Sequence, residues 1–307
     1  MSVQLAYMGV IAIWSTTPLA IKLSSDSVAP LASLSLRIAG ALLGAIVTGW
    51  WFRGRHLLLA KNWRIYLVAS LGIFPNMSLV YLASQYIPSG LIAILFGLIP
   101  FVNGLLALPL LGQSFLSPSK LVAIGLSLTG LILVFYEQLQ NNPAAYTGIA
   151  LMMGSNLLFS ISSLLLKKMT EHQPVQALEQ TIGSMAFALP GLLLSWWFLD
   201  GSLDIQFSET SLWSLLYLTL FGSLLGFFAY FHILKHMEVA TISLIPLMTP
   251  VLAVFLGAVI ADEPISAETL MGTAIIVIAL GLYQGSLLPM IKSLKQRLQR
   301  GLSVEQN

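Results

Sequence analysis

Apolar runs of about 20 residues, each long enough to cross a bilayer as a helix, alternate with short polar or glycine- and proline-rich breaks along the chain. This pattern predicts an all-α polytopic membrane protein with ten transmembrane helices. Because the breaks are short, neighbouring helices must run antiparallel. The expected spans are 4–23, 30–52, 63–84, 89–111, 119–137, 146–168, 175–199, 211–233, 239–260 and 267–290.

Composition supports the membrane class. The chain has 307 residues, of which 57% are hydrophobic and 8% charged, whereas soluble domains are roughly 25% charged. The net charge of +2 indicates neither nucleic acid nor an acidic partner, and the lack of cysteine excludes disulfides and thiolate metal sites. We expect the bilayer and a small-molecule substrate as partners, no cofactor or metal, and a monomer or weak homodimer.

Loop charges predict the orientation. With a cytoplasmic N-terminus, every basic residue except Lys22 and Arg37 falls in an inner loop or the tail, as the positive-inside rule requires. These residues are Arg53, Arg55, Lys61, Arg64, Lys120, Lys167, Lys168, Lys235, Lys292, Lys295, Arg297 and Arg300. The outer loops carry Asp26, Asp200, Asp204, Glu209, Asp262 and Glu263. We therefore expect both termini in the cytoplasm.

Two apolar segments repeat each other at long range. Residues 89–113 and 240–263 are apolar helices with a proline in mid-span, and Pro100 aligns with Pro250. A duplicated, interrupted membrane helix is typical of a transporter built from two related halves. The alternative for each proline is a kink that only shapes packing.

Other segments extend the repeat. Trp14 to Lys22 corresponds to Phe159 to Lys167, and Gly72 to Tyr81 corresponds to Gly222 to Tyr230. The expected halves each contain five spans, an odd number, so the second half enters from the opposite face. The halves are then inverted repeats around a shared central cavity, the basis of alternating access. They cover residues 1–140 and 145–290, and a basic cytoplasmic tail follows at 291–307.

The motif WSTTPLAIK, from Trp14 to Lys22, resembles the opening of the EamA-type drug/metabolite transporters. The second span, with Pro30 followed by Arg37, is similar to their proline–arginine helix, and the proline-bearing fourth and ninth spans resemble their most recognisable segments. The resemblance covers essentially the whole chain. The chain departs from the family at Gln113, where members usually have an acidic residue. A role for a carboxylate at this position therefore has support only in the second repeat, at Glu263.

The resemblance implies a carrier in the bacterial inner membrane for a small organic metabolite, often an exporter of amino acids. The aromatic amino-acid exporters are candidates for close relatives. A broad-range drug efflux carrier is the main alternative. A channel or an intramembrane enzyme is less favoured, because the chain has neither H-E-x-x-H nor G-x-S-x-G. We expect no enzymatic activity and no catalytic residues.

Two ionisable residues fall inside predicted spans. Arg37 lies about 10 Å along the helix from Pro30 at 1.5 Å per residue, and Glu179 lies at a similar depth from the cytoplasmic side. A charge there is unfavourable by at least about 2.5–3.5 kcal/mol unless it is paired or wet. We expect Arg37 to line the outer half of the pathway and Glu179, the one obvious candidate for proton coupling, the inner half. Snorkelling to the interface, or a neutral hydrogen-bonded Glu179, is the alternative.

Polar and aromatic residues near mid-membrane are further candidates for the pathway, although for any one of them contact between helices is the favoured interpretation. They are Trp14, Thr16, Thr17, Asn76, Tyr81, Asn103, Asn156, Phe159, Ser160, Ser163 and Tyr230. The mid-helix prolines Pro100, Pro246 and Pro250 are the expected hinges, with Pro18 and Pro75 as weaker candidates.

Overall fold

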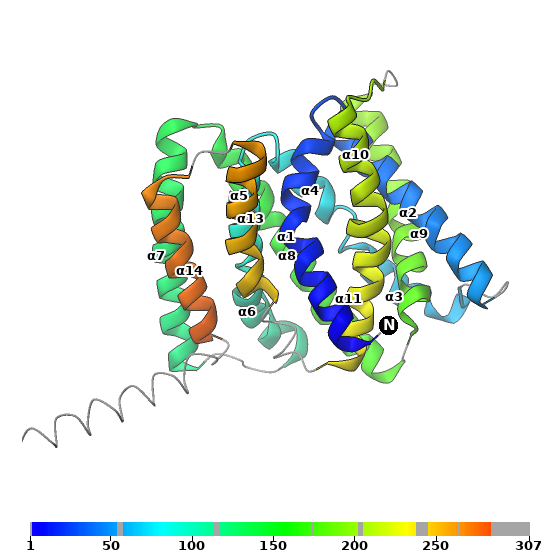
Figure 1. Cartoon of the computed structure of the whole chain (residues 1–307). Helices are drawn as coiled ribbons and strands as arrows, with labels where there is room; N and C mark the ends of the chain where they lie inside the picture. Colours follow the sequence, from blue (N-terminus) through cyan, green and yellow to red (C-terminus); the bar gives the residue numbers. More distant parts are fainter. Residues whose placement is uncertain are drawn as a thin grey trace, which may run out of the picture.

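The computed structural model describes residues 2–53, 58–112, 117–173, 175–201, 205–237, 245–262 and 265–283. Every regular element in these ranges is helical (Figure 1). Six described stretches are long and apolar enough to cross a membrane, and shorter apolar helices accompany them. The expected class, an all-helical polytopic membrane protein, is therefore confirmed. The predicted tail, Gln113 and Glu263 lie outside the described residues.

The long helices run between two faces of the molecule (Figure 1). In the first part of the chain they are α1 (Val3–Ser24), α2 (Pro30–Arg53), α3 (Trp63–Ser70), α4 (Asn76–Ala83), α5 (Ser89–Phe96), α6 (Ile99–Leu111) and α7 (Pro118–Asn141). In the second part they are α8 (Ala145–His172), α9 (Ala177–Ser195), α10 (Glu209–Tyr217), α11 (Gly226–His236), α13 (Ile245–Ala261) and α14 (Ala267–Tyr283). The turn η1 (Ala60–Asn62) and the π-helical stretches η2 (Trp196–Asp200) and η3 (Leu218–Leu225) extend neighbouring helices.

Two of the expected spans, 63–84 and 89–111, are each divided into two helices. Residues 71–75 form a turn between α3 and α4, and residues 97–98 separate α5 from α6. Pro100 therefore lies at the second residue of α6 and not in mid-helix as expected. Proline is well tolerated there, because the N–H that it lacks would have no partner in a first helical turn.

Helix α8 braces both breaks with side-chain hydrogen bonds. Asn156 Nδ2 donates to the carbonyl oxygen of Leu95, 2.7 Å away at the end of α5. Ser155 Oγ donates to Asn76 Oδ1 at 2.5 Å, and Asn76 Nδ2 in turn donates to the carbonyl oxygen of Gly72 at 2.9 Å. In lipid, backbone groups freed by a helix break need such partners inside the protein.

Helices α7 and α14 pair at one edge of the molecule (Figure 1). Their backbones touch at two glycines. A Cβ at Gly130 would lie 2.7 Å from the carbonyl oxygen of Gly272, and a Cβ at Gly272 would lie 2.6 Å from that of Gly130. Small residues at a contact allow this close approach, which is how membrane helices associate without a hydrophobic driving force.

We expect Gly130→Ala and Gly272→Ala each to push these helices apart and to destabilise the protein by about 1–3 kcal/mol, as overpacked cores do. The matched control is Gly125→Ala on the same helix, where a Cβ meets nothing within 4 Å. Thermal unfolding of the purified variants in detergent measures the difference. Equal melting temperatures for all three variants would show that the contact is not essential.

Candidate functional site

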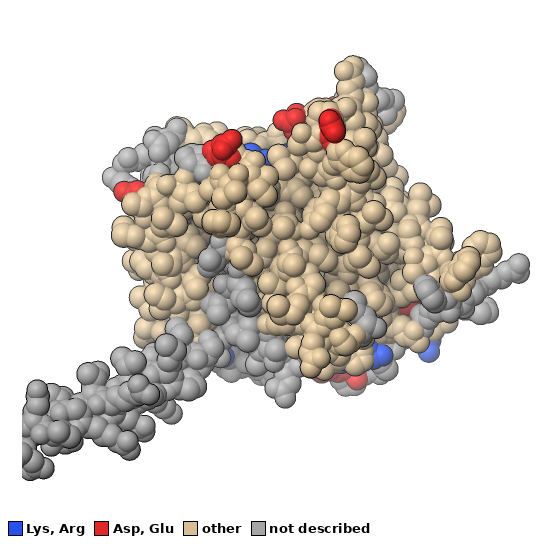
Figure 2. Space-filling view, viewed as in Figure 1, with Lys and Arg blue, Asp and Glu red and all other residues tan. Residues whose placement is uncertain are grey.

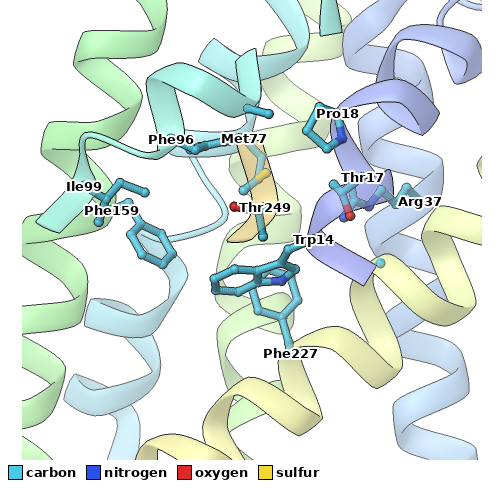
Figure 3. Close-up of a pocket in the computed structure, with 12 residues that line it drawn as sticks. Trp14, Thr17, Pro18, Arg37, Met77, Phe96, Ile99, Phe159, Phe227 and Thr249 are labelled. Carbon is cyan, nitrogen blue, oxygen red and sulfur yellow. The ribbon is translucent and has the colours of Figure 1, made fainter. Parts of the chain in front are cut away.

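A pocket lies where α1, α2, α4, α5 and α6 meet α8, η3, α11 and α13 (Figure 3). Its cavity volume is about 80 Å³, below the range of roughly 300–1,000 Å³ that is usual for small-molecule sites. The residues that line it are Trp14, Thr17, Pro18, Arg37, Met77, Ala93, Phe96, Ile99, Phe159, Gly222, Phe227 and Thr249. The pocket thus draws side chains from both expected halves of the chain.

Arg37 is the one ionisable side chain among these lining residues. It is 2% exposed. Its Nε donates to Ser223 Oγ at 2.7 Å, and its Nη1 donates to the hydroxyl of Tyr81 at 3.3 Å. Both acceptors are neutral and fully buried, so the guanidinium is oriented by hydrogen bonds without being neutralised.

The π-helical stretch η3 makes room for this guanidinium. A Cβ at Gly222 would lie 3.1 Å from Arg37 Nη2, tighter than ordinary van der Waals contact. Nearby, Gly40 of α2 lies against Thr219, and Gly44 lies against Leu224. The small-residue face of α2 therefore packs closely on η3, and this packing places Arg37 at the pocket wall. Local π-helix is frequent at functional sites.

Aromatic rings form another part of the pocket wall. Trp14 and Phe159 both line it, with ring centroids 6.4 Å apart in an edge-on arrangement. Tyr230 packs behind them, 5.3 Å from Trp14 and 6.2 Å from Phe159. In Figure 3, Ile99 and Phe159 lie at the left of the pocket, opposite Thr17 and Arg37 at the right. The site is therefore largely apolar and carries its charge at one end.

The other predicted residues take different positions. Thr17 lines the pocket, whereas the hydroxyl of its neighbour Thr16 lies 2.5 Å from that of Tyr217. Asn76 and Asn156 are bound to the breaks in the helices, as described above. The remaining polar candidates are Asn103 and Ser160, whose side-chain oxygens are buried without a hydrogen-bond partner in the described part of the chain, and Ser163, whose hydroxyl donates to the carbonyl oxygen of Ser160. Of the hinge candidates, Pro100 begins α6, and Pro246 and Pro250 lie within α13.

Glu179 lies in a separate polar cluster at the start of α9. Its Oε1 accepts hydrogen bonds from the hydroxyl of Tyr66 and from Asn62 Nδ2, the latter at 2.7 Å. Gln173 Nε2 donates to Asn62 Oδ1 at 2.5 Å. The ring of Tyr66 fits closely because Gly183 has no Cβ, which would lie 2.4 Å from the ring. The cluster ties α3 to α9, and Glu179 is not among the residues that line the pocket.

Two replacements of Glu179 test whether its hydrogen-bond acceptor oxygen holds α3 against α9. We expect Glu179→Leu to leave the buried amide of Asn62 short of an acceptor and to destabilise the protein by about 1–3 kcal/mol. Glu179→Gln keeps an acceptor oxygen in place and should stay close to the wild type. Thermal unfolding in detergent compares the two variants, and a leucine variant as stable as the glutamine variant would contradict this assignment.

Several site residues were not foreseen from the sequence. They include Gly222 and Phe227 in the pocket, Ser223 beside Arg37, and Asn62, Tyr66 and Gln173 around Glu179. The sequence repeat that begins at Gly222 identifies the segment that contributes to the pocket. It does not show which face of that segment points inward. In a membrane helix apolar residues face both lipid and protein, so hydrophobic periodicity gives no direction.

The profile described as the EamA-like transporter family matches residues 1–136 and 146–283. Protein PagO of Salmonella typhimurium is 25% identical over 287 residues, covering 92% of this chain and 92% of its own. Protein PecM of Dickeya dadantii is 26% identical, covering 75% of this chain and 79% of its own.

Two further similarities concern function and fold. A probable amino-acid metabolite efflux pump of Salmonella typhimurium is 26% identical over 250 residues, covering 73% of this chain and 84% of its own. A solved crystal structure, at 19% identity, superposes with a TM-score of 0.67 over 92% of this chain and 96% of its own. At that identity the likeness shows a shared fold.

Proposed function

Because the chain belongs to the EamA-like transporter family and is a multi-pass membrane transporter, we propose that it carries a small organic metabolite, such as an amino acid, by alternating access. Export across the bacterial inner membrane is the proposed direction and place. The observation that carries the proposal is the central pocket, whose wall combines residues from both segments matched by the family profile.

Helix contacts support an inverted repeat of two five-helix halves. If α1 corresponds to α8, α4 to α11 and α6 to α13, the contacts of α1 with α11 and α13 have counterparts in those of α8 with α4 and α6. All four contacts are present. The contacts α2–α9 and α7–α14 would then each straddle a two-fold axis in the membrane plane, and both are present.

Charge supports cytoplasmic termini. In Figure 2 acidic side chains gather mainly along the upper face, and basic ones lie mainly at the lower face, where Figure 1 marks the N-terminus. The acidic residues Asp26 and Glu209 lie at helix ends remote from the N-terminus, whereas Arg64 and Lys235 lie at ends near it. This one-sided distribution fits the positive-inside rule.

Rocking of the halves around the pocket requires flexible points, and the broken spans supply them. The break between α5 and α6, followed by Pro100, lies directly at the pocket, which Phe96 and Ile99 line on either side of it. In the proposed mechanism α13, which contains Pro246 and Pro250, is the corresponding flexible helix of the second half. Interrupted helices beside a midplane site are typical of carriers built from inverted repeats.

Two observations bear on the alternatives. The apolar, aromatic pocket wall would also suit a broad-range drug carrier. An intramembrane enzyme would need a nucleophile or an acid–base pair, whereas Arg37 is the one ionisable group among the described lining residues. A channel is less favoured because its selectivity would require rings of charges or carbonyls around a pore.

Counterflow in proteoliposomes tests the proposed function. Purified protein is reconstituted into vesicles loaded with one unlabelled amino acid or metabolite at a time, and uptake of the same labelled compound is followed. We expect transient, saturable accumulation of at least one compound, because a carrier exchanges solutes across a sealed compartment. Uptake that does not saturate would indicate a channel, and a chemical product formed in detergent would indicate an enzyme.

Proton coupling through Glu179 stays a prediction of the sequence. If it is right, Glu179→Gln removes the dependence of uptake on a pH gradient while counterflow continues, because exchange needs no net proton movement. Wild-type transport that is the same with and without a pH gradient would refute it. Glu171→Gln, at an exposed position on the same cytoplasmic side, is the matched control.

A further inference from the structure

We propose that Arg37 selects the substrate by charge: it binds the carboxylate of a monoanionic organic acid whose remaining part is apolar. This inference rests on the proposed transport function and makes it more specific. It assigns Arg37 as the residue that determines specificity, and it predicts that the substrate needs no positively charged group.

The first reason is an unbalanced charge. A guanidinium has five N–H donors; two are used on Ser223 and Tyr81, and the others find no acceptor among the described residues. The side chain is 2% exposed and lies in a membrane-spanning helix. A buried charge without a counterion is strongly unfavourable. An anion that enters the pocket would serve as the counterion of Arg37 and remove this unfavourable free energy. Arg37 would therefore contribute most of the binding free energy of an anionic ligand.

The second reason is that no carboxylate of the described chain serves this arginine. None of the described lining residues is acidic. Glu179, the one acid expected deep in the membrane, is held by Tyr66 and Asn62 in the cluster between α3 and α9. The pocket therefore presents one positive charge and no acidic partner for an ammonium group, which favours a monoanion over a zwitterion and disfavours a cation.

The third reason is the shape of the remaining wall. Beyond Arg37 and the hydroxyls of Thr17 and Thr249, the pocket is lined by aromatic and aliphatic side chains, including Trp14, Phe96 and Phe227 (Figure 3). Such a wall binds apolar and planar groups well but provides few hydrogen bonds for sugars or polyols. A ligand with a carboxylate and an apolar remainder would pair with Arg37 at one end of the pocket and pack against the apolar wall at the other.

Four compounds that share one benzyl group separate charge from shape: phenylacetate is an anion, phenylalanine a zwitterion, 2-phenylacetamide neutral and phenethylamine a cation. The intact purified protein is tested with each, by thermal stabilisation in detergent and by competition for counterflow in proteoliposomes. We expect phenylacetate to bind most tightly and phenylalanine less tightly. The amide and the amine should bind at least tenfold more weakly than phenylacetate.

Variants then assign the selectivity to Arg37. Arg37→Gln should weaken phenylacetate binding at least tenfold while leaving the weak binding of 2-phenylacetamide unchanged. Arg37→Lys should retain part of the preference, because it keeps the charge but loses the planar fork. Arg64→Gln, which removes an exposed arginine beside Trp63 at the cytoplasmic end of α3, is the matched control and should behave as the wild type.

The results of these experiments distinguish a failure of the anion site at Arg37 from a failure of the proposed carrier function. Tighter binding of the amide or the amine than of phenylacetate by the wild-type protein overturns the inference, whether or not the arginine variants fold. So does unchanged phenylacetate binding in folded Arg37→Gln. Saturable counterflow of neutral or cationic solutes would then leave the transport function intact. Conversely, Arg37-dependent binding of phenylacetate without counterflow of any compound would support the anion site and overturn the proposed carrier function.

Discussion

Inside a bilayer, a polar backbone group must find its partner within the protein, and this constraint governs where the helices of this chain can break. At the break after α5, the amide of Asn156 donates a hydrogen bond to a backbone carbonyl. At the turn before α4, the amide of Asn76 does the same, and Ser155 donates to Asn76. All of these side chains are buried. The polar residues of α8 thus permit irregular backbone at membrane depth, and the central pocket lies beside it.

The same constraint applies to charge, and the protein meets it in two ways. Glu179 Oε1 accepts hydrogen bonds from Tyr66 of α3 and from Asn62 just before it, so this side chain helps to hold α3 against α9. Arg37 is oriented by two neutral hydroxyls and remains electrostatically unbalanced at the wall of an apolar pocket. One buried ionisable side chain therefore joins two helices, and the other faces the pocket. This contrast is the physical basis for assigning them different roles.

Trp14 and Phe159 illustrate how the two parts of the chain meet. They occupy corresponding positions in the segments that the sequence relates, and their rings contact each other at the pocket. A two-fold relation between the halves would bring such corresponding residues close to its axis. The proposed carrier mechanism needs this geometry, because one wall must be shared by two units that move against each other.

The sequence by itself determined the all-helical membrane class, the approximate positions of most spans and the family, because apolar run length and short loops depend only on local composition. It also singled out Arg37 and Trp14, whose residue types stand out in an apolar helix. Only the tertiary structure decided that Arg37 faces the pocket with neutral partners, that Glu179 belongs to a different cluster, and that Pro100 begins a helix. These outcomes depend on which helices pack together, and in lipid an apolar side chain does not reveal whether it faces protein or membrane.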